Sequence, residues 1–307
     1  MHVLFILCLL FAALLGGAFY AYRIAFYAPK KDRELVKPIA DPAYSPIRDE
    51  LTALYRVLRD RPCEFVTVTS HDGLLLSGRY YHVRDGAPLD IGFHGYRSHA
   101  MGDFSGGSEI SFQLEHNLLL VDQRAHGKSQ GNTISFGIKE RYDVVTWVQY
   151  ALQRFGTETQ ILLFGVSMGA ATVLMAADLS LPNVKGIVAD CPYVNAMDII
   201  CHVGKDNPVP TKLIKPFSLL GARIFGGFDL METDALSAVS RTNIPILVIH
   251  GEADTLVPCE MSAKVPEVNP AYVRRHTFPG AIHAVSYMID RDRYRKLVTE
   301  FFTDVLK

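Results

Sequence analysis

The amino-acid sequence predicts an α/β protein whose mostly parallel central sheet is covered by helices on both faces. Short runs such as Leu118–Val121 and Ile161–Phe164 are apolar throughout rather than alternating, as in strands that are buried on both faces. Helical stretches separate these runs, and polar residues follow directly after them. The 307 residues suffice for one large domain of this class.

The chain opens with an apolar stretch that fits a membrane-spanning helix. Val3–Tyr22 is uncharged and about 20 residues long, the length that a bilayer requires. We expect residues 1–30 to form an uncleaved anchor, and the basic residues that follow the stretch predict that the rest of the chain lies in the cytoplasm. The alternative is a cleaved signal peptide and secretion, although no basic residue precedes the stretch. The basic residues are Arg23, Lys30, Lys31 and Arg33.

Residues 31–307 are expected to form one domain with alternating strands and helices. A helix at 47–61 precedes an antiparallel hairpin at 64–70 and 74–83. Val194–Thr242 interrupts the alternation with apolar, Gly- and Pro-containing sequence, and we interpret it as a helical cap inserted over the strand ends. An ordinary crossover with extra surface helices is the alternative. The remaining strands are predicted at 89–93, 118–121, 161–164, 184–189, 244–249 and 271–278, with helices at 138–155 and 291–306.

A glycine-flanked serine stands near the middle of the chain. Ile161–Phe164 leads into Gly165-Val166-Ser167-Met168-Gly169, and the small-residue stretch 170–178 favours a helix after it. A sharp turn between a strand and a helix strains the serine backbone and projects its hydroxyl from the end of the sheet. We therefore expect Ser167 to be a nucleophile; a tight turn with an inert serine is the alternative.

A base and an acid follow the serine in the order that a catalytic triad requires. A serine hydroxyl needs a base, and the base needs a carboxylate that orients it. Asp254 follows the strand at 244–249, and His283 follows the last predicted strand. Ser167, Asp254 and His283 are therefore the predicted catalytic residues. Glu252 and Asp190 are alternative acids, and His126, His250 and His276 are expected to be structural.

Two backbone N–H groups are candidates for the oxyanion hole. His94-Gly95-Tyr96 follows an early strand, and Met168 follows the serine at the start of a helix. Donors in these positions can stabilise the charge that develops on a carbonyl oxygen during acyl transfer. We expect the N–H groups of Tyr96 and Met168 to play this part.

These motifs together resemble the α/β-hydrolase superfamily over about residues 64–307. The chain looks most like its membrane-anchored, esterase-like branch, which is also described as serine-aminopeptidase-like. The resemblance implies an α/β-hydrolase fold, a Ser167–His283–Asp254 triad and neither a metal nor an organic cofactor. Ala125 and Ala170 depart from the family pattern at positions where glycine is common. The motifs are Phe93-His94-Gly95, Asp122-x-Arg124-x-His126-Gly127-x-Ser129, Gly165-x-Ser167-x-Gly169, Gly251-x-x-Asp254 and Gly280-x-x-His283.

The overall composition narrows the classes of partner. With 31 Lys and Arg against 32 Asp and Glu, the chain has no charge excess of the kind that marks nucleic-acid binding. Its five cysteines show no spacing typical of a zinc site, and free thiols are preferred over a disulfide. We expect no metal and no cofactor, and the oligomeric state is left open.

The predicted activity is hydrolysis of carboxylic esters through an acyl-enzyme. The substrate is expected to be a small-molecule or lipid ester, because the predicted cap is apolar and an anchor would hold the enzyme at a membrane. Lysophospholipase or monoacylglycerol lipase, thioesterase and aminopeptidase activities use the same triad and stay open. A non-catalytic binding module on the same scaffold is the alternative from another class.

Overall fold

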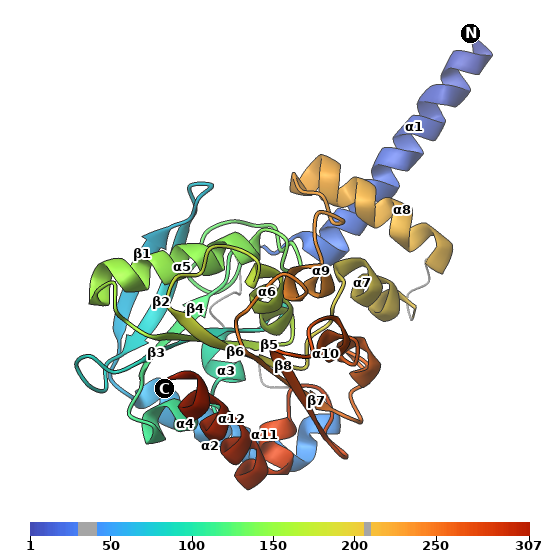
Figure 1. Ribbon diagram of the computed structural model, residues 1–307. Helices are drawn as coiled ribbons and strands as arrows, with labels where there is room; N and C mark the ends of the chain where they lie inside the picture. The colour runs from blue at the N-terminus through green and yellow to red at the C-terminus, as the bar shows by residue number, and fades with distance from the viewer. Residues whose placement is uncertain (30–41, 206–209) are drawn as a thin grey trace.

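A single sheet of eight strands organises the part of the chain that the structure describes. The computed structural model describes residues 1–29, 42–205 and 210–307. The strand order is β1-β2-β4-β3-β5-β6-β7-β8 (Figure 1). β2 pairs antiparallel with β1 and β4, and every later pair is parallel, so the predicted mostly parallel sheet is confirmed. The strands are β1 (Glu64–Thr69), β2 (Leu75–Tyr81), β3 (Leu89–Phe93), β4 (Asn117–Asp122), β5 (Ile161–Val166), β6 (Val184–Asp190), β7 (Ile246–Gly251) and β8 (Val273–Phe278).

The apolar runs of β4 and β5 do not alternate because each of these strands contributes to two hydrophobic cores. Side chains alternate between the faces of a strand. Leu119 and Leu163 therefore lie in one core with Trp147, whereas Leu120 and Leu162 lie in the other. The first core is covered by α5 (Glu140–Phe155) and α6 (Met168–Ala176), and the second by α2 (Arg48–Asp60) and α12 (Arg291–Val305). Burial on both faces is what removed the period-two alternation from the sequence.

Several short helices connect these larger elements. A single helical turn carries too few residues to show a hydrophobic period, so the sequence predicted none of them. Two of them fill the connection between β3 and β4, next to the loop that carries Tyr96. The short helices are η2 (Pro42–Ile47), α3 (Ala100–Asp103), α4 (Ser108–Gln113), η4 (Cys259–Ser262), α10 (Val265–Val268) and α11 (Ser286–Ile289).

The N-terminal helix projects from the body of the protein. α1 (His2–Ala21) is almost entirely exposed and continues into a π-helical turn, η1 (Tyr22–Phe26) (Figure 1). His2–Phe26 is long and apolar enough to cross a membrane, a property that membrane anchors share with signal sequences. By contrast, Phe26 is fully buried in the core that also contains Trp147. Lys30, Lys31 and Arg33 lie outside the described residues, so the domain boundary near residue 30 and the orientation stay predictions.

The segment between β6 and β7 is helical, and it packs against α1. It comprises α7 (Ala196–Gly204), α8 (Thr211–Gly221), η3 (Ala222–Gly226) and α9 (Ala235–Val239). A Cβ atom on Gly17 of α1 would overlap the ring of Phe217 in α8, so the two helices touch where α1 has no side chain. Phe19 and Phe225 contact edge to face, with ring centroids 5.2 Å apart. The interpretation of residues 194–242 as a cap stays a prediction.

Candidate active site

Ser167 lies in the turn between β5 and α6 with a strained backbone. Its φ of 55° and ψ of −115° fall outside the regions that non-glycine residues ordinarily occupy. A 2.8 Å hydrogen bond from the Ser167 N–H to the Asp190 carbonyl holds the turn. A Cβ atom on Gly165 would overlap the backbone of Gly169, and one on Gly169 would overlap the Phe93 carbonyl. The sequence expectation of a strained serine flanked by obligatory glycines is therefore observed.

The imidazole of His283 bridges the serine and a carboxylate. Nε2 lies 2.9 Å from Ser167 Oγ, and Nδ1 lies 2.7 Å from Asp254 Oδ2. An ionised carboxylate only accepts, so Nδ1 carries the proton and Nε2 is free to accept from the serine hydroxyl. The loop that carries His283 is fixed by Tyr44, whose hydroxyl donates to the His283 carbonyl at 2.8 Å. The three predicted residues thus form one continuous hydrogen-bonded chain.

Asp254 is buried yet surrounded by donors. The backbone N–H groups of Leu256 and Val257 donate to Oδ1 at 3.0 and 2.8 Å, and Nε2 of His250 lies 3.4 Å from Oδ2. Burial raises the pKa of Asp254, but hydrogen bonds from His250 and His283 outweigh it and lower the pKa to about 2. The carboxylate is therefore ionised at neutral pH, as an orienting group for an imidazole should be.

The other candidate acids lie elsewhere. Glu252 is exposed and accepts a 2.6 Å hydrogen bond from Thr277. Asp190 is buried, where Tyr294 donates to its Oδ2 at 2.8 Å. Burial raises the pKa of Asp190 to about 6, against the lowering effect of Tyr294. Neither carboxylate hydrogen-bonds His283 within the described residues.

The other histidines hold loops or strand ends. His126 accepts at Nε2 from the Arg97 N–H (2.9 Å), and its Nδ1 donates to the Arg124 carbonyl. His250 lies next to the end of β7, and its Nε2 donates to the Val257 carbonyl at 2.8 Å. The structural roles expected for these two histidines are therefore observed. The sequence did not reveal that His250 also approaches the Asp254 carboxylate, because the geometry of the loop after β7 carries no periodic signal.

The loop after β3 presses against Ser167. A Cβ atom on Gly95 would stand 3.2 Å from Asp103 Oδ2 and 3.3 Å from Ser167 Cβ, closer than ordinary van der Waals contact. The N–H groups on either side of Tyr96 are engaged: that of Gly95 donates to Asp103 at 2.6 Å, and that of Arg97 donates to His126. Across the described residues the N–H groups of Tyr96 and Met168 have no hydrogen-bond acceptor. Asp103 gave no sequence signal because it stands in a single-turn helix.

Two groups of side chains have the donor atoms that metal ions use. Ligand atoms of Cys191, Asp254 and His283 lie within 4.8 Å of one another, as do those of His71, Asp72 and Asp143. In the second group the Arg124 guanidinium already bonds Asp143 at 2.6 Å and Asp72 at 2.8 Å, which supplies the positive charge a cation would bring. In the first, Asp254 and His283 are bonded to each other. All five cysteines are free thiols.

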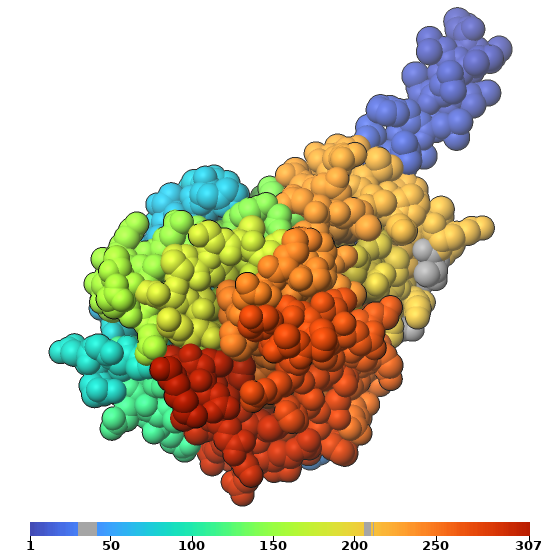
Figure 2. Space-filling model, viewed as in Figure 1, coloured from blue at the N-terminus to red at the C-terminus, as the bar shows by residue number. Residues whose placement is uncertain are grey.

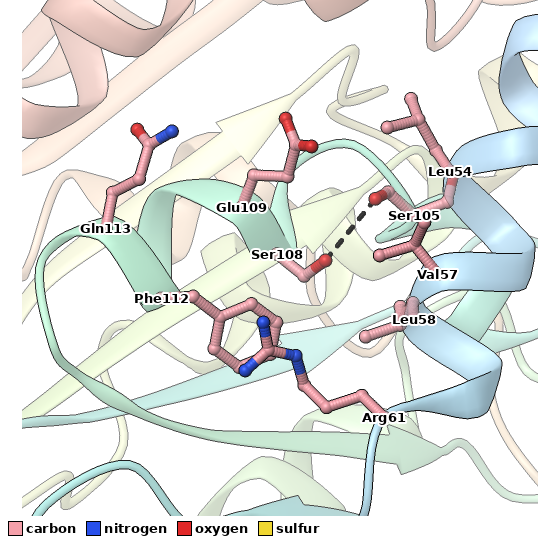
Figure 3. Close-up of a pocket in the computed structure, with 9 residues that line it drawn as sticks. All are labelled: Leu54, Val57, Leu58, Arg61, Ser105, Ser108, Glu109, Phe112 and Gln113. Atoms are coloured by element: carbon pink, nitrogen blue, oxygen red, sulfur yellow. Dashed lines mark hydrogen bonds between the residues drawn. The ribbon is translucent and has the colours of Figure 1, made fainter.

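A hollow of about 210 Å³ lies between α2 and α4, apart from the triad (Figure 3). The guanidinium of Arg61 stacks over the Phe112 ring at 3.8 Å, and Ser108 donates to the Ser105 carbonyl at 3.3 Å. None of Ser167, Asp254 and His283 lines this hollow. Its lining residues are Leu54, Val57, Leu58, Arg61, Ser105, Ser108, Glu109, Phe112 and Gln113.

Comparison with known proteins identifies the fold. A family model described as the alpha/beta hydrolase fold matches residues 99–214. The esterase Pf2001 of Pyrococcus furiosus superposes with a TM-score of 0.66 at 23% identity, covering 81% of this chain and 92% of that one. The chain therefore has the α/β-hydrolase fold, as its motifs indicated.

Curated relatives extend the similarity along the chain. The protein YqkD of Bacillus subtilis is 23% identical over 291 residues, which is 94% of this chain and 92% of the relative. The lysophosphatidylserine lipase ABHD12 of Danio rerio is 25% identical over 171 residues, 51% of this chain and 40% of the lipase. The similarity to YqkD includes most of the chain, whereas that to the lipase is partial.

Proposed function

We propose that this protein of the α/β-hydrolase fold is a serine hydrolase that cleaves carboxylic esters through an acyl-enzyme. The observation that carries the proposal is the hydrogen-bonded chain from Ser167 through His283 to Asp254. A strained serine next to an imidazole whose other nitrogen binds a buried carboxylate has the arrangement of an activated nucleophile. A purely structural serine would need neither the strain nor the base.

The first half of the proposed reaction acylates Ser167. Nε2 of His283 takes the hydroxyl proton while Oγ attacks the ester carbonyl, and Asp254 stabilises the imidazolium that forms. The carbonyl oxygen becomes an oxyanion, to which the N–H groups of Tyr96 and Met168 donate. The tetrahedral intermediate then expels the alcohol, which receives its proton from His283.

The second half releases the acid. A water molecule gives a proton to His283 and attacks the acyl-enzyme carbonyl, and the same two N–H groups stabilise the second oxyanion. Collapse of this intermediate frees the carboxylic acid and returns the proton to Ser167. No residue beyond the triad and these two N–H groups is required for either half.

Esters are favoured over other acyl substrates by the similarity to an esterase and, in part of the chain, to a lysophosphatidylserine lipase. Lysophospholipids and monoacylglycerols are members of this class. Thioester and amino-terminal peptide substrates would use the same triad. A non-catalytic binding module would not require an ionised Asp254 carboxylate surrounded by hydrogen-bond donors.

For the location, we propose that residues 1–30 anchor the chain in a membrane and that residues 31–307, with a cap at 194–242, face the cytoplasm. The exposed apolar surface of α1 supports the anchor. Secretion after cleavage is the competing possibility, and a reporter fused after Lys307 would separate the two.

The function is tested by hydrolysis of p-nitrophenyl esters of increasing acyl length by the full-length protein in detergent. Ser167→Ala should lower kcat by about 10⁴ or more without changing thermal stability, and the length optimum should show whether short acids or fatty acids are preferred. Equal activity in the wild type and the variant would refute the assigned nucleophile. Inactivity of the folded wild type on all esters would refute the ester specificity.

A further inference from the structure

An apolar face surrounds the place where α1 joins the rest of the protein. α8 crosses the C-terminal end of α1, and α1 stands out beyond it (Figures 1 and 2). Close contact is possible because small residues meet: a Cβ atom on Gly221 would overlap the carbonyl of Ala18, which is itself fully buried. Large apolar side chains around this crossing nevertheless remain exposed. They are Phe19, Tyr20, Ile24, Leu213, Ile224 and Phe225.

The position of the crossing along α1 relates this face to a bilayer. The 20 residues of α1 give a helix of about 30 Å, the thickness of a hydrocarbon core. The contacts with α8 and η3 involve Gly17, Ala18 and Phe19, within about two turns of the end of α1. If α1 spans the bilayer, α8 and η3 lie at its boundary, where an amphipathic helix inserts its apolar side chains.

The segments that form this face carry only basic charges, one of which, Arg223, is paired with Asp229 outside them at 3.0 Å. Residues 1–29 and 211–226 contain Arg23, Lys212, Lys215 and Arg223 and not one Asp or Glu. All four basic side chains are exposed. The Arg23 guanidinium stacks over the Tyr27 ring at 3.8 Å, which holds it beside the end of α1. Basic side chains beside exposed apolar ones complement anionic phospholipid headgroups above an acyl layer.

We infer that α8 and η3 form a second membrane-binding element, which lays this face of the protein on an anionic phospholipid surface around α1. The anchor then does not act as a flexible tether, because Gly17 and Ala18 are packed against the domain. Residues just beyond α1 contact the loop that carries Tyr96: the carbonyl of Ala25 accepts from the Tyr96 hydroxyl, and that of Ile24 accepts from the Arg97 side chain. On the proposed function, the substrate is accordingly an amphiphilic ester taken from the bilayer.

Quenching of tryptophan fluorescence by brominated lipids tests the membrane contact without requiring turnover. Full-length protein is reconstituted into phosphatidylcholine and phosphatidylglycerol vesicles with and without brominated acyl chains. Ile224→Trp reports the proposed face, where this side chain is 50% exposed. Leu9→Trp in the middle of α1 is the positive control. Val57→Trp on α2, 64% exposed and at the other end of the molecule in Figure 1, is the negative control.

The buried native Trp147 supplies the same background in every variant. We expect brominated lipids to quench the added fluorescence of Ile224→Trp and Leu9→Trp, and to leave that of Val57→Trp unchanged. Quenching at Leu9 without quenching at Ile224 would overturn the inference, because α1 would then be a tether. Absence of quenching at Leu9 would overturn it as well, since α1 would not be inserted.

A pair of charge substitutions separates the membrane contact from the chemistry. Leu213→Asp combined with Ile224→Asp should lower hydrolysis of a vesicle-borne lysophospholipid by about 10-fold or more and leave hydrolysis of a soluble p-nitrophenyl ester unchanged. Val57→Asp is the matched control on a distant helix. Equal loss on both substrates, or no loss on vesicles, would contradict bilayer docking. Inactivity of the wild type on both substrates would refute the proposed function while the quenching result still decides the docking.

Discussion

The hydroxyl of Tyr96 donates a 2.8 Å hydrogen bond to the carbonyl of Ala25. This bond joins the loop beside Ser167 to the turn that follows the N-terminal helix. Arg97 adds a 2.7 Å bond to the Ile24 carbonyl, and the ring of Tyr96 stacks on Phe136 at 5.0 Å. The residues just beyond α1 therefore support the proposed oxyanion hole as well as the fold.

Removal of the Tyr96 hydroxyl should affect catalysis more than stability. Tyr96→Phe keeps the stacked ring and the backbone N–H but loses the bond to Ala25, which is worth about 1 kcal/mol. We expect a decrease in kcat of about 3- to 10-fold with little change in KM, because a misplaced donor acts on the transition state. Steady-state kinetics on a p-nitrophenyl ester measure it. An unchanged kcat would show that this bond does not position the loop.

The buried end of the N-terminal segment should be essential for stability. Phe26→Ala empties a fully buried site between Phe136 and Phe228, and we expect the free energy of unfolding to fall by about 3–5 kcal/mol. Phe5→Ala, in the exposed part of α1, is the matched control and should have no comparable effect. Urea denaturation in detergent compares the two. Equal stability of both variants would mean that residues 22–28 are dispensable for the domain.

Neutralising the two acids in the loop after β7, one at a time, should have very different effects on kcat. Asp254→Asn removes the ionised partner of His283 and should lower kcat by about 10⁴. Glu252→Gln, two residues earlier on the exposed side of the loop, should leave kcat within about 2-fold of the wild type. The melting temperatures of both variants are compared first. Steady-state kinetics on one ester then measure the kcat of each. The reverse order of effects would assign the orienting acid to Glu252.

The buried carboxyl of Asp190 should make stability depend on pH. Burial raises its pKa to about 6, so the folded state holds the proton more tightly than the unfolded chain, whose value is about 3.9. Its stabilising contribution is present below about pH 4 and is lost as pH rises through 6. Asp190→Asn retains an acceptor for Tyr294 and should gain about 1–3 kcal/mol relative to the wild type between pH 4 and pH 8.

Denaturation of both proteins across this range measures the difference. Tyr294→Phe removes a hydrogen bond that lowers the same pKa, so its stability should fall further than that of the wild type, and up to a higher pH. Parallel stability curves for the wild type and Asp190→Asn would show that Asp190 is ionised without cost in the folded protein.

Elements of the fold and of the site could be predicted from the sequence where the immediate surroundings of a residue restrict which residue can stand there. Strands buried on both faces, such as Ile161–Phe164, needed apolar side chains on each face, and the strained turn at Ser167 needed glycine on both sides. Asp254 and His283 were recognisable because each directly follows a strand. These elements are specified by short-range geometry, which a single sequence contains.

Contacts that depend on how a loop folds or on how distant segments pack were not predictable in this way. The hydrogen bond from the Gly95 N–H to Asp103 depends on a four-residue helix without periodicity. The approach of His250 to Asp254 depends on how one loop folds back on its own strand. The burial of Phe26 and the contact of Gly17 with Phe217 arise only after segments about 100 residues or more apart have packed together. No spacing in the sequence encodes such pairs.

The central claim is that Ser167 is a nucleophile activated by His283, and labelling with a biotinylated fluorophosphonate tests it most directly. Full-length protein is treated with the probe, digested and analysed by peptide mass spectrometry. The account predicts one adduct, on Ser167, that forms about 10² or more times slower in His283→Ala and is absent from a folded Ser167→Ala variant. A folded wild type that takes up no probe, or an adduct on a different residue, would contradict it.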